Sequence, residues 1–316
     1  MTAADPTQVD GGPTAGVSST FQRQMGLARD ASAPGRYLVD VDPRWNCPVV
    51  PQGGIMAAIA AMAMAAELAH PDQRLRSLTT VFAGRVPAGP VTVDVSVLRR
   101  GRSMSQALAQ VRAPGGEVGH TSVAVFGRSR PGFEFTDLHM PDVPPPQECP
   151  SFRDPLPPGA GDFERRPPFA FWENVEGRPA LGHAPWEDYV PTSSDCAHWY
   201  RFDEPPMLPD GTLDPFAVVA LCDLMPSSVG ERMGPGQPMW LPPSADLTVH
   251  VLGEAHSEWL LAHLRARRAS EGYASVETAM WDQTGQLVAH AAQVMFLSFP
   301  EGPPTPEQRV PFDQRS

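Results

Sequence analysis

The chain has 316 residues, of which 41% are hydrophobic and 19% charged, and this composition is typical of a globular protein rather than a disordered one. Its 24 basic residues, all of them arginine, face 36 acidic residues, which gives a net charge of -12. That balance disfavours a nucleic-acid binder, because such proteins need a concentrated basic face. The four cysteines form no C-x-x-C pair, so they predict neither a zinc ribbon nor a disulfide scaffold.

Neither export nor insertion into a membrane is predicted. The first thirty residues lack the apolar core of a signal peptide. The longest apolar run, Gly53 to Ala66, has 14 residues and is too short and too weakly apolar to span a bilayer. We therefore expect a soluble, cytoplasmic protein with reduced cysteines.

Proline divides the chain into two blocks. There are 38 prolines, and they crowd the stretch from Pro131 to Pro168, which includes Pro144-Pro145-Pro146. Because proline lacks a backbone donor and favours an extended course, this stretch predicts a linker. The expected organisation is a disordered tail (1–30), a first domain (31–130), a linker (131–163), a second domain (164–300) and a C-terminal tail (301–316).

The first block has the pattern of one buried helix followed by strands. Pro51-Gln52-Gly53-Gly54 precedes a helix expected to run to about Ala69, and this helix is apolar nearly all round, as buried helices are. The two glycines leave its N-terminal N–H groups open to a ligand. Four strand-like runs follow, separated by turns: Ser77–Phe82, Val91–Leu98, Ser105–Ala113 and Gly119–Phe126.

The second block repeats that plan. A helix is predicted from about Asp214 to Arg232, and Val288-Ala289-His290 follows Val118-Gly119-His120 at an offset of 170 residues. One helix followed by an antiparallel sheet, twice, indicates an internal duplication and an α+β fold. The strand-like runs of this block are Phe171–Glu176, Ala197–Phe202, Ala245–Leu252, Trp259–Arg267, Ala274–Trp281 and Val288–Phe299.

A helix that begins with Gly-Gly, followed by strands that contain Leu98-Arg99-Arg100-Gly101-Arg102-Ser103, resembles the hot-dog fold. In that fold an antiparallel sheet wraps around one long central helix. Two such units with a proline-rich linker resemble the acyl-CoA thioesterase II family, the double hot-dog thioesterases. The resemblance covers about residues 45–127 and 164–299, and it implies a tandem double hot-dog.

The resemblance also implies three site residues. Family members use an aspartate, a hydroxyl residue and a glutamine of the second unit to hold the attacking water. Leu221-Cys222-Asp223-Leu224 matches the aspartate in the second helix, and Ser244-Ala245-Asp246 matches the hydroxyl two residues before an aspartate. Gln293 matches the glutamine, because it follows the run Gly285-Gln286-Leu287-Val288-Ala289 in the final strand. We therefore expect Asp223, Ser244 and Gln293 to be catalytic.

The chemistry of thioester hydrolysis suits these residue types. It needs a placed water, a base and donors for the developing oxyanion. Asp223 is the only charged residue between Asp214 and Glu231, and partial desolvation can raise the pKa of such a carboxylate toward neutrality. Backbone N–H groups of Gly53 and Gly54, supplied by the first half, are the candidate oxyanion donors. The alternative for Asp223 is a merely structural role at a kink, since Pro226 follows closely.

The polar set is confined to the second half. At the 170-residue offset Gln293 corresponds to Val123, and the first helix has no acid between Gly53 and Ala66. A shared fold therefore does not explain the three residues.

Arginine is the expected ligand for the phosphates of CoA, because its fork pairs bidentately with them. Two groups are candidates, although each could equally be a solvated surface cluster: Arg99, Arg100 and Arg102 in the first half, and Arg265, Arg267 and Arg268 in the second.

The sequence thus predicts an acyl-CoA thioesterase that hydrolyses a fatty or related acyl-CoA, or a carrier-protein thioester, to the free acid. No metal or organic cofactor is implied, and the resemblance makes a homodimer plausible. Two alternatives stay open. One is a non-catalytic acyl-thioester-binding protein; the other is a hot-dog enoyl-thioester hydratase, although no Asp/His pair is suitably placed after Gly53 or Asp214. The absence of a Gly-x-Ser-x-Gly elbow disfavours a serine hydrolase.

Overall fold

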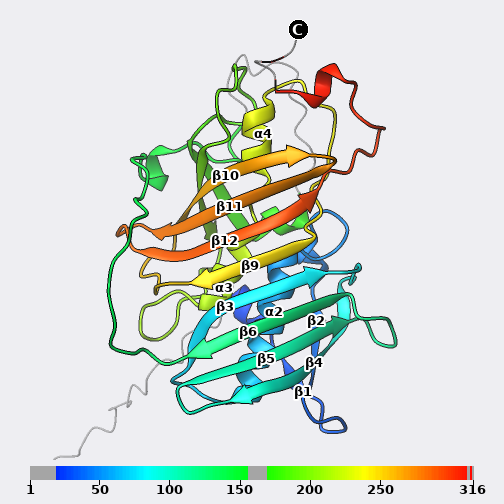
Figure 1. Ribbon diagram of the computed structural model, residues 1–316, viewed down its shortest axis with the longest axis vertical. Coiled ribbons are helices and arrows are strands. Elements are labelled where there is room, and N and C mark those ends of the chain that lie inside the picture. The colour runs from blue at the N-terminus through cyan, green and yellow to red at the C-terminus, as the bar shows by residue number, and fades with distance from the viewer. Residues whose placement is uncertain (1–18, 156–168, 312–313, 315–316) are drawn as a thin grey trace, which may run out of the picture.

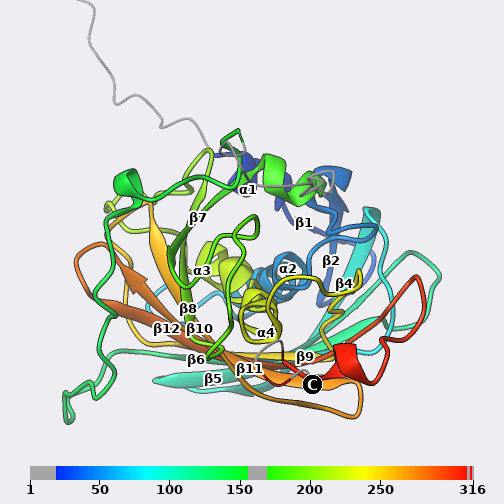
Figure 2. The same cartoon turned by 90° about the horizontal axis from the view of Figure 1, so that it is seen from above.

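The computed structural model describes residues 19–155, 169–311 and 314 of the chain. These residues form a 12-stranded sheet in which every neighbouring pair is antiparallel, in the order β1-β2-β4-β5-β6-β3-β9-β12-β11-β10-β8-β7. The first half of the chain supplies one side of the sheet and the second half the other (Figure 1). Seen from above, the sheet curves around the central helices of both halves (Figure 2). The double hot-dog architecture is therefore confirmed.

The first half builds six strands around one long helix. The helix α2 spans Gly53–Leu68, close to the predicted limits. Four strands match the predicted runs, while β1 and β2 were not predicted. The strands are β1 (Ala28–Arg29), β2 (Arg36–Val41), β3 (Arg74–Phe82), β4 (Gly89–Arg100), β5 (Met104–Arg112) and β6 (His120–Gly127).

The second half builds six strands around a shorter helix. Its strands are β7 (Val175–Leu181), β8 (Cys196–Phe202), β9 (Asp246–Val251), β10 (Leu260–Ser270), β11 (Tyr273–Asp282) and β12 (Leu287–Phe296). The prediction of a strand over Phe171–Glu176 was wrong in its first part. Ala170–Glu173 forms a 3-10 turn that carries the buried Phe171 into the core, and β7 begins only at Val175.

The halves join where β3 pairs with β9 near the middle of the sheet. Thr79 lies opposite Thr248, and their hydroxyl oxygens are 3.1 Å apart. The five paired positions of β3 and β9 are centred on this pair, as a pseudo-two-fold axis through it requires. Thr79 and Thr248 are therefore equivalent positions in the two halves. Since Val123 pairs with Thr79 and Ala292 with Thr248, the counterpart of Gln293 is Ala124, one residue beyond the predicted Val123.

Most of helix α2 is buried, because the sheet covers one side and α3 (Pro215–Cys222) packs against another. Its alanines favour helix and allow close packing. The side chain of Gln52 caps its first turn by accepting a hydrogen bond from the Ile55 N–H at 2.8 Å. At the other end Arg100 donates to the carbonyl groups of Glu67 and Leu68, which otherwise lack helical partners.

The second central helix is not continuous as predicted. Helix α3 ends at Cys222, and a separate helix, α4, spans Ser227–Met233. Pro226 lacks the N–H that would bond to the Cys222 carbonyl of a continuous helix, and its ring would clash there. Asp223 therefore lies at the C-cap of α3, with φ −89° and ψ 24°, and not inside a helix.

The prediction of a disordered tail was wrong for residues 19–30. Thr20–Gln24 forms helix α1, which Ser19 caps, and β1 pairs with β2. Phe21 and Met25 are fully buried in the core, where Phe21 contacts Phe202 with ring centroids 5.3 Å apart. This burial fixes the segment. The remainder of the predicted tail lies outside the described residues.

The described part of the predicted linker from residue 140 onward covers the outer face of the second half. Cys149 is buried in a cluster with Trp199, and the Trp199 Nε1 donates to the Pro144 carbonyl at 2.9 Å. Arg178 donates to the Pro146 carbonyl at 2.8 Å. The segment is therefore part of the packed second unit as well as a connection. The predicted C-terminal tail contains a 3-10 turn at Glu307–Arg309.

Candidate active site

Asp223 lies between the two central helices. It is 8% exposed, and its Oδ2 accepts a hydrogen bond from the Gly54 N–H at 2.9 Å, at the start of α2. Its Oδ1 accepts a hydrogen bond from the Ser244 hydroxyl at 3.0 Å. Burial raises the pKa of Asp223 to about 7, against the opposing effect of hydrogen bonds from Ser244, Gly54 and Gly53. The group is thus poised to exchange a proton near neutral pH.

Ser244 is held in place by the segment that leads into β9. The Ala245 N–H donates to the Val294 carbonyl at 2.8 Å, and the Phe82 N–H donates to the Ala245 carbonyl at 3.0 Å. The Asp246 side chain accepts from the Val294 N–H at 2.7 Å. These bonds hold the segment between β3 and β12, so the backbone position from which the Ser244 side chain extends is fixed.

Gln293 completes the group from β12. It is 3% exposed, and its Oε1 lies 3.5 Å from the Ser244 Oγ. Its Nε2 is buried and has no hydrogen-bond partner in the described part of the chain. The three residues predicted as catalytic, Asp223, Ser244 and Gln293, are therefore neighbours in one buried polar cluster, although they come from three separate elements.

The two glycines at the start of α2 allow the close approach of α3. A Cβ on Gly54 would lie 2.4 Å from the Ala220 carbonyl oxygen and 2.9 Å from the Asp223 Cβ, and one on Gly53 would lie 2.7 Å from the Asp223 Oδ2. The Gly54 N–H therefore binds the Asp223 carboxylate and does not face a substrate oxyanion. In the structure these glycines place the Asp223 carboxylate, a role that differs from the predicted one.

The equivalent positions of the first half are apolar. Asp223 lies nine residues after Asp214, the N-cap of α3. The residue nine positions after Gln52, the N-cap of α2, is Ala61. Ser244 corresponds to Leu75 through the symmetric pairing of β3 with β9, and Gln293 corresponds to Ala124. All three counterparts are buried. Only one of the two pseudo-equivalent sites carries polar groups, as the sequence indicated.

Two thiols near Asp223 are poor nucleophiles. Burial, and to a smaller degree the charge of Asp223, raises the pKa of Cys47 to about 12. The same two effects raise the pKa of Cys222. Both thiols are protonated at neutral pH, and a thiol without its thiolate form reacts slowly.

Two neighbours of the cluster were not predicted. The Phe82 ring lies against Gly53, where an added Cβ would be 3.0 Å from its Cζ, and it meets the buried His120 edge-on at 5.0 Å between ring centroids. Gln52 reaches from the α2 cap to α3, where its Nε2 donates to the Ala220 carbonyl at 3.2 Å. The position of Gln52 directly before the two glycines could have indicated that it lies near the site. No feature of the sequence indicated this for Phe82.

The first-half arginines lie far from the cluster. Arg100 binds the C-terminal carbonyl groups of α2, and α2 alone puts it about 20 Å from Gly54. Arg99 and Arg102 are exposed and make no ion pair within the described residues.

The second-half arginines lie at the level of the cluster but on the other face of the sheet. Ala266 pairs with Val276, and Val276 with Gln293, whose side chain is buried inside. Arg265 and Arg267 flank Ala266, so they point outward. Arg265 pairs with Asp195 at 2.9 Å, Arg267 pairs with Glu277, and Arg268 donates to Ser270 at 3.1 Å.

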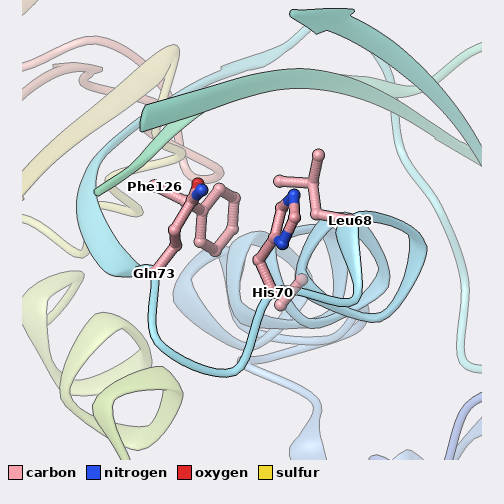
Figure 3. A pocket seen from close by; sticks show the side chains of 5 residues that line it. Leu68, His70, Gln73 and Phe126 are labelled. Carbon is pink, nitrogen blue, oxygen red and sulfur yellow. The ribbon is translucent and has the colours of Figure 1, made fainter. Parts of the chain in front are cut away.

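A small pocket of about 20 Å³ lies at the opposite end of α2 from the cluster. His70 and Gln73 enter it from the turn after the helix, beside Leu68 and Phe126 (Figure 3). Its volume suits about one water molecule. Within the described ranges, no group of three or more His, Cys, Asp or Glu side chains is arranged to hold a metal ion, and no helix is long and apolar enough to span a membrane.

Comparison with solved structures shows the same fold in other proteins. A hot-dog protein of unknown function from Alicyclobacillus acidocaldarius is 26% identical, with a TM-score of 0.73 over 90% of this chain and 100% of that chain. An acyl-CoA thioesterase II from Mycobacterium marinum is 21% identical, with a TM-score of 0.67 over 90% of this chain and 100% of that one. The tesB protein of Mycobacterium avium subspecies paratuberculosis is 19% identical, with a TM-score of 0.65 over 90% and 98%. No curated protein matches the chain.

Family models match both halves of the chain. Residues 41–127 match the acyl-CoA thioesterase N-terminal domain. Residues 146–297 match the acyl-CoA thioesterase C-terminal domain. Because these segments together span most of the sequence and coincide with the two halves of the sheet, the protein belongs to the acyl-CoA thioesterase family.

Proposed function

We propose that the protein hydrolyses a fatty or related acyl-CoA to the free acid and CoA, with a water activated by Asp223. The observation that carries the proposal is a buried carboxylate that shares hydrogen bonds with Ser244 and the start of α2, beside the buried Gln293. A charged group so buried is costly to folding, and such groups gather where chemistry needs them. Family membership names the reaction class.

The proton transfers of the proposed reaction need only side chains already in the cluster. A water donates a hydrogen bond to the Asp223 carboxylate and accepts one from the Gln293 Nε2, which has no hydrogen-bond partner in the described part of the chain. The hydrogen bond from the Ser244 hydroxyl orients the Asp223 carboxylate toward this water. The water oxygen then attacks the thioester carbonyl, its proton passes to Asp223, and the C–S bond breaks as the proton is delivered to the leaving thiolate. The two protonated thiols nearby play no covalent part.

Binding of the CoA phosphates is proposed for the exposed Arg99 and Arg102, which form no ion pair within the described residues. Arg100, Arg265, Arg267 and Arg268 are weaker candidates, because each already binds a carbonyl, carboxylate or hydroxyl oxygen. This division follows from the partners in the structure rather than from the sequence.

A thiol-release assay over a panel of acyl-CoAs tests the proposed reaction. We expect hydrolysis of at least one chain-length class, with Asp223→Asn as the blank. The same acyl groups presented on a carrier protein identify the form of the substrate. Binding of acyl-CoA without thiol release from any member of the panel would contradict hydrolysis and indicate a binding protein.

Gln293→Ala and Ser244→Ala are expected to lower kcat by different amounts. Loss of an amide donor that holds the water costs about 10²-fold, comparable with loss of an oxyanion donor. Loss of the Ser244 hydroxyl costs about tenfold, because Asp223 keeps its other hydrogen bond to Gly54. Steady-state kinetics check the order, with Thr248→Ala, on the outer face of the central strands, as the matched control. A Gln293→Ala enzyme with the parental kcat would exclude Gln293 from the reaction.

A further inference from the structure

Gln52 connects the two helices on which the proposed site is built. It is 4% exposed, and both ends of its amide are used. The Oε1 accepts from the Ile55 N–H at 2.8 Å and so caps α2. The Nε2 donates to the Ala220 carbonyl at 3.2 Å, in the last turn of α3 and three residues before Asp223. A helix cap needs only the acceptor, so the donor serves something else.

The corresponding cap of α3 lacks this connection. Asp214 accepts from the Phe216 N–H at 2.9 Å and is likewise buried, so it does the same capping. A carboxylate has no N–H and cannot donate to a carbonyl group of α2. The cross-helix bond therefore exists only at the end of the helix pair where Asp223 lies, and the equivalent position beside Asp214 is the apolar Ala61.

The bond from Gln52 acts together with the Gly54 N–H. Ala220 and Asp223 belong to the same helix end, whose final carbonyl groups lack helical partners because the helix stops at Cys222. Gln52 binds the backbone of that end, and Gly54 binds the carboxylate at 2.9 Å. Two contacts from one short segment fix both the position and the rotation of the Asp223 side chain.

We propose that Gln52 is a positioning residue for Asp223: its cross-helix hydrogen bond keeps the carboxylate on the Gly54 N–H and aimed at the attacking water. This inference rests on the proposed function for its catalytic consequence. Its structural consequence is independent of it, because the Gly54 hydrogen bond stabilises the ionised carboxylate. Loosening the contact therefore raises the pKa of Asp223, whatever the substrate.

Two variants separate the donor from the cap. Gln52→Asn keeps a favourable helix cap but is one methylene too short to reach Ala220 while capping. Gln52→Glu keeps the length and the capping acceptor but replaces the donor with a second acceptor. Asp214→Asn is the matched control, since it changes the equivalent cap of α3. Thermal melts establish that each variant is folded.

The decisive readout is the titration of Asp223, followed by difference infrared spectroscopy of its carboxyl stretch, with Asp223→Asn to assign the band. We expect both Gln52 variants to raise the pKa of Asp223, by about one unit for Gln52→Asn, and Asp214→Asn to leave it unchanged. An unchanged pKa in a folded Gln52→Asn protein would overturn the proposal. Failure of both Gln52 variants to fold would also overturn it, because the contact would then be structural.

Activity then distinguishes this inference from the proposed function. If the protein is a thioesterase, Gln52→Asn lowers kcat about 10- to 100-fold with KM within about twofold, because a misdirected base affects the transition state. If the parent releases no thiol from any acyl-CoA but the Asp223 titration still shifts in the variants, the reaction is wrong while the positioning contact stands. A shifted titration together with the parental kcat would show that Gln52 does not position a catalytic group.

Discussion

The Asp223→Asn variant is expected to lose about 10²–10⁴ of the parental kcat for acyl-CoA hydrolysis, with a modest change in KM. The substitution keeps the size of the side chain, and its carbonyl oxygen can still accept from the Gly54 N–H. It removes the carboxylate that we propose takes the proton from the water. Because that transfer occurs only in the transition state, the loss falls on kcat. Thiol release at saturating acyl-CoA measures it.

The control for this variant is Asp214→Asn, which neutralises another buried carboxylate at the opposite end of α3. It should retain the parental kcat, because Asp214 caps a helix and does not reach the polar cluster. If both variants lost activity equally, the effect would reflect disturbance of the helix. An Asp223→Asn enzyme with the parental kcat would exclude Asp223 as the base.

The same substitution is expected to stabilise the protein at alkaline pH. Burial raises the pKa of Asp223 from 3.8 to about 7 in the folded chain. Below the pKa of the unfolded chain, the Asp223 carboxyl is protonated in both the folded and the unfolded state, so it does not change the free energy of unfolding relative to asparagine. Between the two values only the folded state keeps the proton, so stability falls as the pH rises, and above the folded value the full penalty persists. Three pKa units correspond to at most about 4 kcal/mol of unfolding free energy.

Urea unfolding at pH 4, 6 and 8 tests this linkage. The unfolding free energies of the parent and of Asp223→Asn should agree at pH 4 and diverge progressively, with the variant more stable at pH 8. A difference that is the same at all three pH values would contradict a raised pKa and point to altered packing instead. A stabilised but inactive variant would show that the buried carboxylate is kept for chemistry at a cost to folding.

Much of this fold follows from local patterns in the sequence. An apolar stretch after two glycines predicted α2 almost to the residue, because nothing inside Gly53–Leu68 interrupts it. The alternation of strands and glycine-rich turns located β3 to β6 and β9 to β12. These elements are decided by residues close together in the chain, which is what a periodic pattern records.

Elements decided by distant contacts were missed. Residues 19–30 carry little periodicity, and they are ordered because Phe21 and Met25 enter a core built by other segments. The stretch from Phe171 has strand-forming residues, yet tertiary packing of Phe171 makes it a 3-10 turn. The break after Cys222 was signalled by Pro226, but an apolar run on both sides favoured a longer helix.

The candidate site residues were indicated by the resemblance to the acyl-CoA thioesterase II family, through the places of three residues in the second half, and not by geometry. The resemblance pointed to Asp223, and the position of this acid in an otherwise apolar stretch supported that match. The sequence could not show that the Gly54 N–H would bind that acid rather than a substrate, since the contact joins positions 169 residues apart. Gln52 was overlooked for the same reason, because its second partner lies in the other half.

The pH dependence of kcat/KM for acyl-CoA hydrolysis tests the central claim most directly, because the base must be ionised to accept the proton from water. With the pKa of Asp223 raised to about 7 by burial, kcat/KM should rise tenfold per pH unit below that value and level off above it. The residual activity of Asp223→Asn should lack this step. A parental profile that is flat from pH 5 to 8, or the same step in Asp223→Asn, would contradict the assignment of Asp223 as the general base.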